Sequence, residues 1–129
     1  MSTLKEIVII DDDVAICQVL QLLLSDIAKI TYFHDVDSAN EYLKDNSENI
    51  KLLILDFNIG KQSGIDFYKQ NVIAKGMDIP AVLISGFIVT QLKTAPELLE
   101  LNELFVKVFE KPFDFVEFKS FLETTIFTS

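Results

Sequence analysis

The stretch KLLILD at residues 51–56 decides the fold. Four consecutive apolar residues end in a carboxylate, and a short continuous apolar run is typical of a strand buried on both faces. Such strands occur in parallel sheets that carry helices on each side. The strand would place Asp56 at the carboxyl-terminal edge of the sheet, where open α/β sheets bind their ligands. Residues 57–64 are rich in turn formers and predict a loop before any helix resumes.

The rest of the chain alternates strands with helices. Apolar runs predict five strands, and helical spacing or capping signals predict five helices. The strands are expected at residues 6–10, 29–33, 50–56, 79–85 and 105–109, and the helices at residues 14–28, 38–44, 64–75, 96–103 and 114–126. This alternation implies a parallel sheet with right-handed crossovers. We therefore expect an α/β fold with one doubly wound five-stranded sheet and helices on both faces.

Several helix ends can be predicted from single residues. Asp13 and Asp114 each precede a helical pattern, and a carboxylate there can accept an N–H of the first turn. Residues 38–41 have the spacing of a capping box, which predicts a helix that begins at Ser38. Gly76 is expected to end the helix over residues 64–75.

Composition narrows the class of protein. The chain has 129 residues, which suits one domain over residues 1–129, and 50% of them are hydrophobic, which argues against disorder. No apolar stretch reaches the roughly 18 residues of a membrane span, and the first residues do not have the pattern of a signal peptide. A net charge of −9 argues against direct binding to nucleic acid. The single cysteine agrees with a cytoplasmic location.

Side chains able to do chemistry follow four of the predicted strands. Asp11 and Asp12 follow the first strand, Asp56 ends the third, Ser85 ends the fourth, and Lys111 follows the fifth. In the doubly wound order 2-1-3-4-5, strands one and three are neighbours, so the three acids would crowd together. Crowded carboxylates need a compensating cation, and oxygen ligands favour Mg²⁺ or Mn²⁺. A hydroxyl and an ammonium facing that cation would suit the oxygens of a phosphoryl group.

The chain resembles the receiver domain of two-component response regulators, the CheY-like family. The resemblance covers essentially the whole chain and rests on four short motifs in the expected order. They are IIDD at residues 9–12, LILD at 53–56 with Ser63-Gly64 downstream, ISG at 84–86, and KPF at 111–113. The resemblance implies the flavodoxin-like strand order 2-1-3-4-5 rather than leaving it to be deduced.

The resemblance also implies a function. Asp56 would accept a phosphoryl group from a phosphohistidine on a sensor histidine kinase or a phosphotransfer protein. Ser85 would move to the phosphoryl group, and Lys111 would pair with it. The domain would not be an enzyme, although it would assist its own phosphorylation and dephosphorylation. Its output would be contact with a downstream protein, and the apolar last helix suggests a partner face or a homodimer through the fourth helix, fifth strand and fifth helix.

The same resemblance implies a metal site. Asp12 would bind Mg²⁺ directly, and Asp11 would assist, often through water. Asp56 would share the metal with the phosphoryl group, and Asn58 would contribute its backbone carbonyl. Mn²⁺ could replace Mg²⁺.

Three features depart from the family pattern. Val108 lies three residues before Lys111, where Tyr or Phe is usual, and Gly60 lies where Pro is common. The interval from Ser85 to Lys111 is about one helical turn longer than expected. Because Val108 has no ring to swing, we expect the signal to leave through residues 86–94, which would be mobile without phosphate. The family also implies a cis bond between Lys111 and Pro112.

Two other functions fit parts of the pattern. A small Mg²⁺-dependent phosphatase could use Asp56 as its nucleophile, but such enzymes carry a second acid where this chain has Asn58. A degenerate receiver could act only as a docking module, which the intact acids and Lys111 argue against. Of the remaining reactive residues, His34 is expected at the surface without a partner, and Cys17 is expected to pack passively on the first helix.

Overall fold

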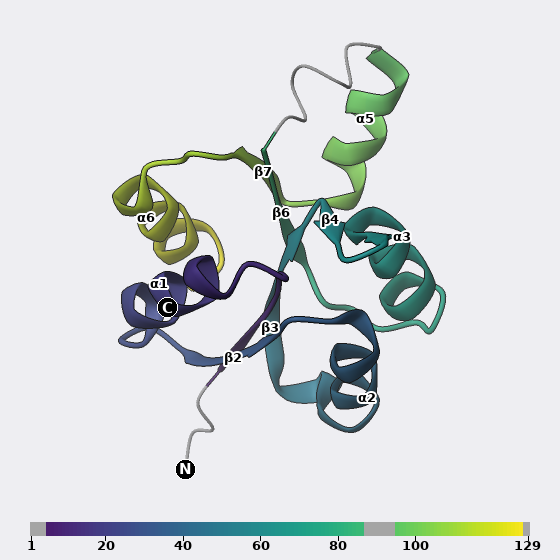
Figure 1. Cartoon of the computed structure of the whole chain (residues 1–129), viewed down its shortest axis with the longest axis horizontal. Coiled ribbons are helices and arrows are strands. Elements are labelled where there is room, and N and C mark those ends of the chain that lie inside the picture. The colour runs from purple at the N-terminus through teal and green to yellow at the C-terminus, as the bar shows by residue number, and fades with distance from the viewer. Residues whose placement is uncertain (1–4, 87–94, 128–129) are drawn as a thin grey trace.

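A five-stranded parallel sheet forms the centre of the protein (Figure 1). The structure is a computed structural model that describes residues 5–86 and 95–127. The sheet contains β1 (Glu6–Ile10), β2 (Lys29–Phe33), β3 (Ile50–Asp56), β6 (Ala81–Ser85) and β7 (Lys107–Glu110). Their order is β2-β1-β3-β6-β7. Counted along the chain, this is the order 2-1-3-4-5, so the predicted topology is confirmed.

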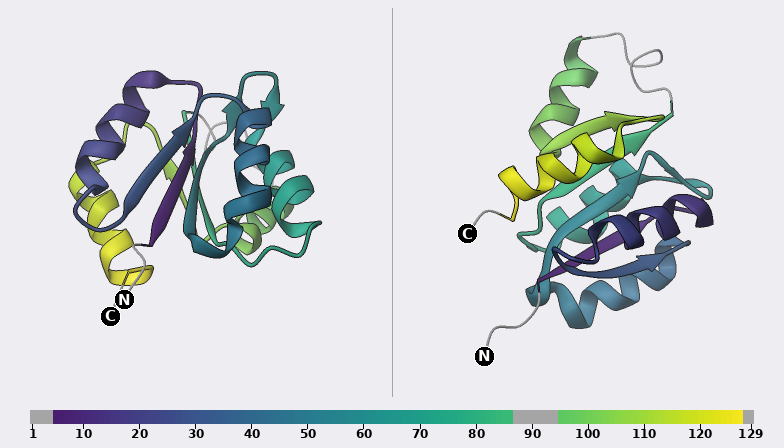
Figure 2. Two further views of the ribbon diagram at one scale, coloured as in Figure 1. Left: turned by 90° about the horizontal axis from the view of Figure 1, so that it is seen from below. Right: turned by 90° about the vertical axis from the view of Figure 1, so that its left-hand side faces the viewer.

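Helices cover both faces of the sheet, as Figure 2 shows. One face carries α1 (Val14–Leu24) and α6 (Phe115–Thr125), and the other carries α2 (Val36–Asn46), α3 (Gly64–Tyr68) and α5 (Ala95–Leu104). Within the described ranges, none of the helices combines the length and the apolar character that crossing a bilayer would need.

The central strands send alternate side chains into two cores. In β3, Leu52 and Ile54 pack under α1 and α6, whereas Leu53 and Leu55 pack under α2, α3 and α5. All four side chains are fully buried. Successive residues of a strand point to opposite faces, so a strand covered on both faces must be apolar at every position. The continuous apolar run in the sequence is explained by this double burial.

Two predicted helix caps are confirmed, the starts of α5 and α6 differ from the prediction by one residue, and the start of α2 differs by two. The carboxylates of Asp13 and Asp114 accept N–H groups of the first turns of α1 and α6, which confirms both caps. The start of α2 at Ser38 was wrong, because α2 begins at Val36. Asp35 is its N-cap and accepts hydrogen bonds from both the N–H and the hydroxyl of Ser38. An aspartate ahead of the capping-box serine therefore moved the helix start two residues earlier.

Several element boundaries differ from the sequence expectation. The first helix ends at Leu24 rather than residue 28. The helix expected over residues 64–75 is α3 followed by a π-helical turn, Lys69–Ile73, and the segment ends at Gly76, whose φ is +72°. The fourth strand begins at Ala81 instead of residue 79.

The last strand of the sheet begins later than expected. Phe105 was assigned to it, but the N–H of Phe105 donates to the carbonyl of Leu101 and so continues α5. The ring of Phe105 is buried and lies 5.2 Å, between centroids, from that of Tyr68. Pairing with the sheet starts at Val106, whose N–H donates to the carbonyl of Ala81. Packing of the phenylalanine ring under the sheet thus prevailed over its strand propensity.

The sequence did not predict the 3₁₀ helix Ser47–Asn49 or a hairpin after β3. A short antiparallel hairpin, β4 (Asn58–Ile59) with β5 (Gln62–Ser63), forms where only a loop was expected. The exposed turn contains Gly60 with a φ of +62°, and the side chain of Ile59 is buried. The mobile output segment expected over residues 86–94 lies outside the described residues, apart from Gly86.

Candidate functional site

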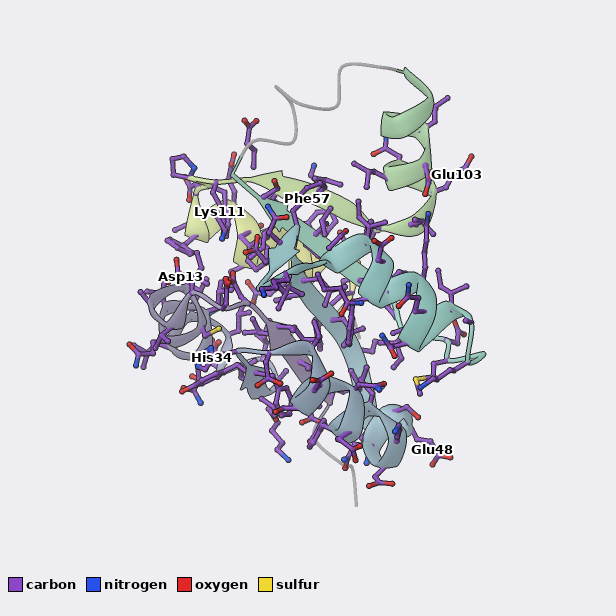
Figure 3. All side chains as sticks on the ribbon, turned by 45° about the vertical axis from the view of Figure 1, so that its right-hand side comes forward. Asp13, His34, Glu48, Phe57, Glu103 and Lys111 are labelled. Atoms are coloured by element: carbon purple, nitrogen blue, oxygen red, sulfur yellow. The ribbon has the colours of Figure 1, made fainter. Side chains whose placement is uncertain are left out.

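The sequence-predicted site residues meet at the carboxyl-terminal edge of the sheet. Asp11 follows β1, Asp56 ends β3, Ser85 ends β6, and Lys111 follows β7. Asp13, Phe57 and Lys111, which are labelled in Figure 3, mark the loops at this edge. The arrangement arises because all five strands are parallel, so their last residues share one side of the sheet.

Three carboxylates converge at this edge. Asp11, Asp12 and Asp56 each offer an oxygen, and these oxygens all lie within 4.8 Å of one another. Asp11 is fully buried, Asp56 is partly buried and Asp12 is exposed. Carboxylate oxygens so close together repel unless a cation lies between them. The cluster could therefore bind a metal, and its all-oxygen donor set fits a hard divalent ion.

Lys111 supplies positive charge from the opposite side. Its ammonium nitrogen lies 3.4 Å from Oδ2 of Asp11 and 3.6 Å from Oδ1 of Asp56. Burial alone would lower the pKa of Lys111, but the charges of Asp11 and Asp56 hold that pKa above its ordinary value. Lys111 therefore stays charged, and its single charge lies beside two of the three carboxylates.

The pKa of Asp56 is raised at this site. Burial, followed by the charge of Asp11, raises the pKa of Asp56 from 3.8 to about 7, although Lys111 acts in the opposite direction. A carboxyl with that pKa is partly protonated at neutral pH. A cation at the cluster would favour the ionised form, which is the form that can act as a nucleophile.

Ser85 lies at the same edge and is almost completely buried. It is opposite Glu110 in the register of β6 and β7, and its carbonyl accepts the N–H of Lys111 at 2.6 Å. The two residues that would approach a phosphoryl group are thus joined through the backbone. The peptide bond between Lys111 and Pro112 is cis, as predicted.

Gly64 permits a close approach that no other residue would allow. A Cβ atom built on Gly64 would lie 2.0 Å from the carbonyl oxygen of Asp56. The N–H of Gly64 donates to the carbonyl of Phe57, which closes the hairpin against the strand end. The sequence pattern flagged Ser63-Gly64 only as part of a motif, and the contact supplies the physical reason.

The departure at Gly60 also has a structural counterpart. The N–H of Gly60 donates to Oδ2 of Asp12 at 3.1 Å. A proline at this position could supply neither that N–H nor a φ of +62°. Asn58 lies in the same hairpin, opposite Ser63.

The expectation that His34 has no partner was wrong. Its Nδ1 atom lies 3.1 Å from the carbonyl oxygen of Asp11, and the thiol of Cys17 donates to the same oxygen at 3.6 Å. A carbonyl only accepts, so Nδ1 must carry the hydrogen. Cys17 is fully buried, which confirms its packing role, and burial followed by the charge of Asp11 raises the pKa of its thiol to about 12. No local pattern links residues 23 positions apart, so the contact was not visible in the sequence.

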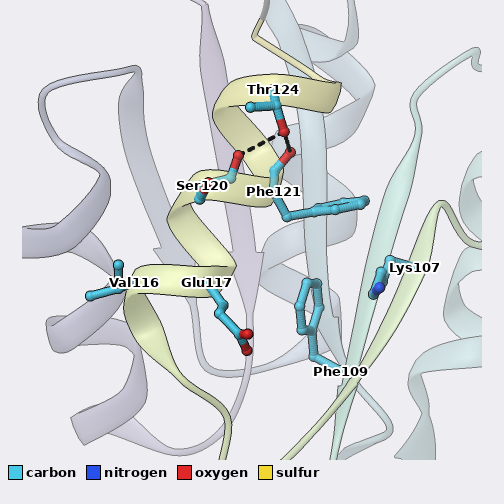
Figure 4. Close-up of a pocket in the computed structure, with 7 residues that line it drawn as sticks. All are labelled: Lys107, Phe109, Val116, Glu117, Ser120, Phe121 and Thr124. Carbon is cyan, nitrogen blue, oxygen red and sulfur yellow. Dashed lines mark hydrogen bonds between the residues drawn. The ribbon is translucent and has the colours of Figure 1, made fainter.

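Val108 and Phe109 pack on opposite faces of the sheet. Val108 is half-buried against the core under α5, whereas its neighbour Phe109 lies among Phe113, Phe118 and Phe121. A groove of about 490 Å³ runs between β7 and α6 (Figure 4). Its lining residues are Lys107, Phe109, Val116, Glu117, Ser120, Phe121 and Thr124. Phe118 is buried, Phe109, Phe113 and Phe121 are partly buried against the same core, and Val116 is exposed beside the groove.

The fold and this edge define a doubly wound α/β domain that could hold a cation and an anionic group at one site. A family model, the response regulator receiver domain, matches residues 7–123. The chain belongs to this family. The resemblance deduced from the four motifs is confirmed.

Individual relatives agree with this assignment. Regulatory protein VirG of Agrobacterium fabrum is 29% identical over 116 residues, which are 89% of this chain and 43% of VirG. This chain thus spans less than half the length of that curated relative.

Solved structures share the fold. The non-phosphorylated receiver domain of HemR from Leptospira biflexa is 23% identical, with a TM-score of 0.79 over 97% of this chain and 96% of that chain. A CheY-like receiver domain from Methylobacillus flagellatus is 25% identical, with a TM-score of 0.72 over 95% of this chain and 98% of that chain.

Proposed function

We propose that this receiver domain is a phosphorylation-switched signalling domain in which Asp56 accepts a phosphoryl group from a phosphohistidine. The observation that supports this most is the position of Asp56. Its carboxyl lies at the strand end, between two further acids and the ammonium of Lys111, 3.6 Å away. A nucleophile, a cation site and a fixed positive charge are the parts that phosphoryl transfer needs.

Asp11, Asp12, Asp56 and the backbone carbonyl of Asn58 hold a divalent cation in this proposal. Mg²⁺ suits the oxygen ligands, and Mn²⁺ can replace it. When bound, the cation neutralises charge on the carboxylates and on the phosphoryl oxygens. A cation there would also favour the ionised form of Asp56, which matters because burial, followed by the charge of Asp11, raises the pKa of this carboxyl to about 7.

The transfer itself uses the residues of the sheet edge. A carboxylate oxygen of Asp56 attacks phosphorus, and the bond between phosphorus and the imidazole nitrogen of the donor breaks. The nitrogen leaves with the electron pair and takes a proton from solvent. Lys111 neutralises charge on the moving group, and Ser85 moves to donate its hydroxyl to a phosphoryl oxygen. The protein contributes mostly positioning and charge stabilisation.

The partners in this proposal are proteins. A sensor histidine kinase or a phosphotransfer protein supplies the phosphoryl group, and a downstream protein reads the phosphorylated form. A homodimer through α5, β7 and α6 is the other candidate, supported by exposed apolar side chains at Leu99, Val106 and Val116. Residues 1–129 act as one receiver domain, and the cytoplasmic location stays a prediction.

A labelling experiment tests the proposal. The chain is incubated with acetyl phosphate and Mg²⁺, and bound phosphate is measured by intact mass. We expect one phosphoryl group per wild-type chain, none in Asp56→Asn, and none in the wild type with EDTA. Labelling of Asp56→Asn at the wild-type level would refute the assignment of the acceptor. Repeated turnover of a small phosphoester would instead favour a phosphatase, and absence of any labelling would favour a docking module.

A further inference from the structure

The carboxylate of Asp12 is bonded to the tip of the β4–β5 hairpin. Its Oδ2 atom accepts the N–H of Gly60 at 3.1 Å, across 48 positions of sequence. The side chain of Asp12 is exposed, so burial does not fix its conformation. A hydrogen bond from a rigid backbone group restricts the rotamers of such a side chain. The bond occupies one site on Oδ2 and leaves Oδ1 open to another ligand.

The turn presents this N–H because of the conformation of Gly60. Gly60 has a φ of +62°, and Lys61 has a negative φ, which is the pattern of a type II′ turn. The ladder pairs Ile59 with Gln62, so the N–H of Gly60 lies outside the ladder and can bond elsewhere. A Cβ at Gly60 would meet nothing within 4 Å. The positive φ, rather than a lack of space, is what requires glycine here.

The base of the hairpin is fixed to the sheet independently of Asp12. The N–H of Phe57 donates to the carbonyl of Ile84, and that of Gly64 donates to the carbonyl of Phe57, both at 2.8 Å. Ile59 is buried in the core. A hairpin fixed at its base and bonded at its tip to Asp12 holds that carboxylate within the acidic cluster.

We propose that the backbone N–H of Gly60 is a positioning group for the cation site, which holds Asp12 towards Asp56 and couples cation binding to the hairpin. The inference rests on the proposed cation site. Fixing Asp12 before the cation arrives lowers the entropy lost on binding. By reciprocity, a bound cation must stabilise the bond between Asp12 and Gly60 by the same free energy. The group acts through Asp12 and touches neither the cation nor the phosphoryl group.

Amide hydrogen exchange at Gly60 tests the coupling in the full chain. Without metal, we expect exchange at Gly60 to be about ten-fold faster in Asp12→Ala than in the wild type, because the N–H of Gly60 loses its acceptor. Adding Mg²⁺ should slow exchange at Gly60 in the wild type and leave Asp12→Ala unchanged. Equal exchange in the two proteins, or a wild-type rate that ignores Mg²⁺, overturns the inference.

A matched pair of variants tests the effect on the metal. Gly60→Pro removes the N–H and cannot adopt a positive φ, whereas Gly60→Asn keeps the N–H and tolerates this region. We expect Mn²⁺ binding, measured by electron paramagnetic resonance, to weaken about ten-fold in Gly60→Pro, which corresponds to about 1.4 kcal/mol. Gly60→Asn should bind as the wild type does. Equal affinities of Gly60→Pro and the wild type overturn the inference.

The two measurements separate this inference from the proposed function. If the wild type binds Mn²⁺ and Gly60→Pro binds it equally well, the tether fails and the cation site stands. If the wild type binds neither Mn²⁺ nor Mg²⁺, the cation site and the coupling fail together. If Gly60→Pro does not fold, the exchange rates of the wild type and Asp12→Ala decide the question.

Discussion

Two buried carboxylates lie at opposite ends of β1, Glu6 at its start and Asp11 just beyond its end. Their hydrogen-bond and charge partners differ. Glu6, at the amino-terminal edge of the sheet, accepts hydrogen bonds from the hydroxyls of Thr31 and Tyr42. The ammonium of Lys29 lies 4.0 Å from it. Asp11, at the other edge, accepts the N–H of Asp13 and faces Lys111, but it also lies among two further carboxylates.

The difference shows that the acids around Asp11 lack the charge compensation that Glu6 has. Two neutral donors and a nearby cation satisfy Glu6 from within the fold. The acids around Asp11 bring more negative charge than the single ammonium of Lys111 can balance. Only protonation or an added cation relieves the excess. The edge at Glu6 therefore needs no added cation. The edge at Asp11 is expected to change its charge balance when a cation binds.

The largest effect on stability is expected from Glu6, at the amino-terminal edge of the sheet. Glu6→Ala leaves the hydroxyls of Thr31 and Tyr42 without their acceptor. We expect the free energy of unfolding to fall by about 3 kcal/mol, measured from the urea midpoint at unchanged slope. Glu6→Gln keeps an acceptor oxygen and should lose about half as much. Phosphorylation of Asp56 should be unchanged. A loss below about 0.5 kcal/mol in Glu6→Ala would contradict the idea that the hydrogen bonds to Glu6 stabilise this edge.

A smaller effect is expected from pH without divalent cations. The pKa of Asp56 is raised from 3.8 to about 7 in the folded chain, so its protonated form stabilises the native state. That contribution is complete below the unfolded pKa and is lost as the pH rises through the folded pKa. Between pH 5 and pH 8 we expect the part of the melting temperature due to Asp56 to fall by about 5 °C, limited by solvent screening.

The control for this titration is Asp56→Asn, which has no carboxyl to ionise. Its melting temperature should depend less on pH over the same interval, and the difference between the two proteins isolates Asp56. A wild type whose stability rises from pH 5 to pH 8 by more than that of Asp56→Asn would contradict the assignment.

The smallest effect is expected from the cation itself. Mg²⁺ at about ten times its dissociation constant should raise the melting temperature by about 4 °C, because it binds only the folded chain. Asp12→Ala should lose most of this rise. Glu6→Ala should keep it, since Glu6 lies at the opposite edge. A rise of equal size in Asp12→Ala would place the metal elsewhere.

Features of the fold that depend on neighbouring residues were predicted better than features that depend on distant ones. The existence and order of the five strands and the caps at Asp13 and Asp114 depend on residues within a few positions, and these predictions were correct, although two strands begin later than predicted. The convergence of Asp11, Asp12 and Asp56 depends on the strand order, which came from the family resemblance and which the structure confirms.

The parts that were missed depend on contacts between distant residues. Glu6 bonds with Thr31 and Tyr42 over 25 and 36 positions, and Asp12 bonds with Gly60 over 48. Nothing in the neighbouring sequence links the two members of each pair. The error at α2 has a different origin, because two overlapping capping signals competed and Asp35 prevailed.

The environment of Cys17 allows this residue to report how often α1 detaches from the sheet. Cys17 is the single cysteine of the sequence and is fully buried, and burial followed by the charge of Asp11 raises the pKa of its thiol to about 12. Thiol reagents attack the thiolate, so the folded protein should resist alkylation at neutral pH. Modification then proceeds only when α1 detaches from the sheet, and its rate measures how often that happens. Because the thiol donates to the carbonyl of Asp11, the rate of its alkylation also reports whether the acidic edge of the sheet is intact. No engineered probe is needed.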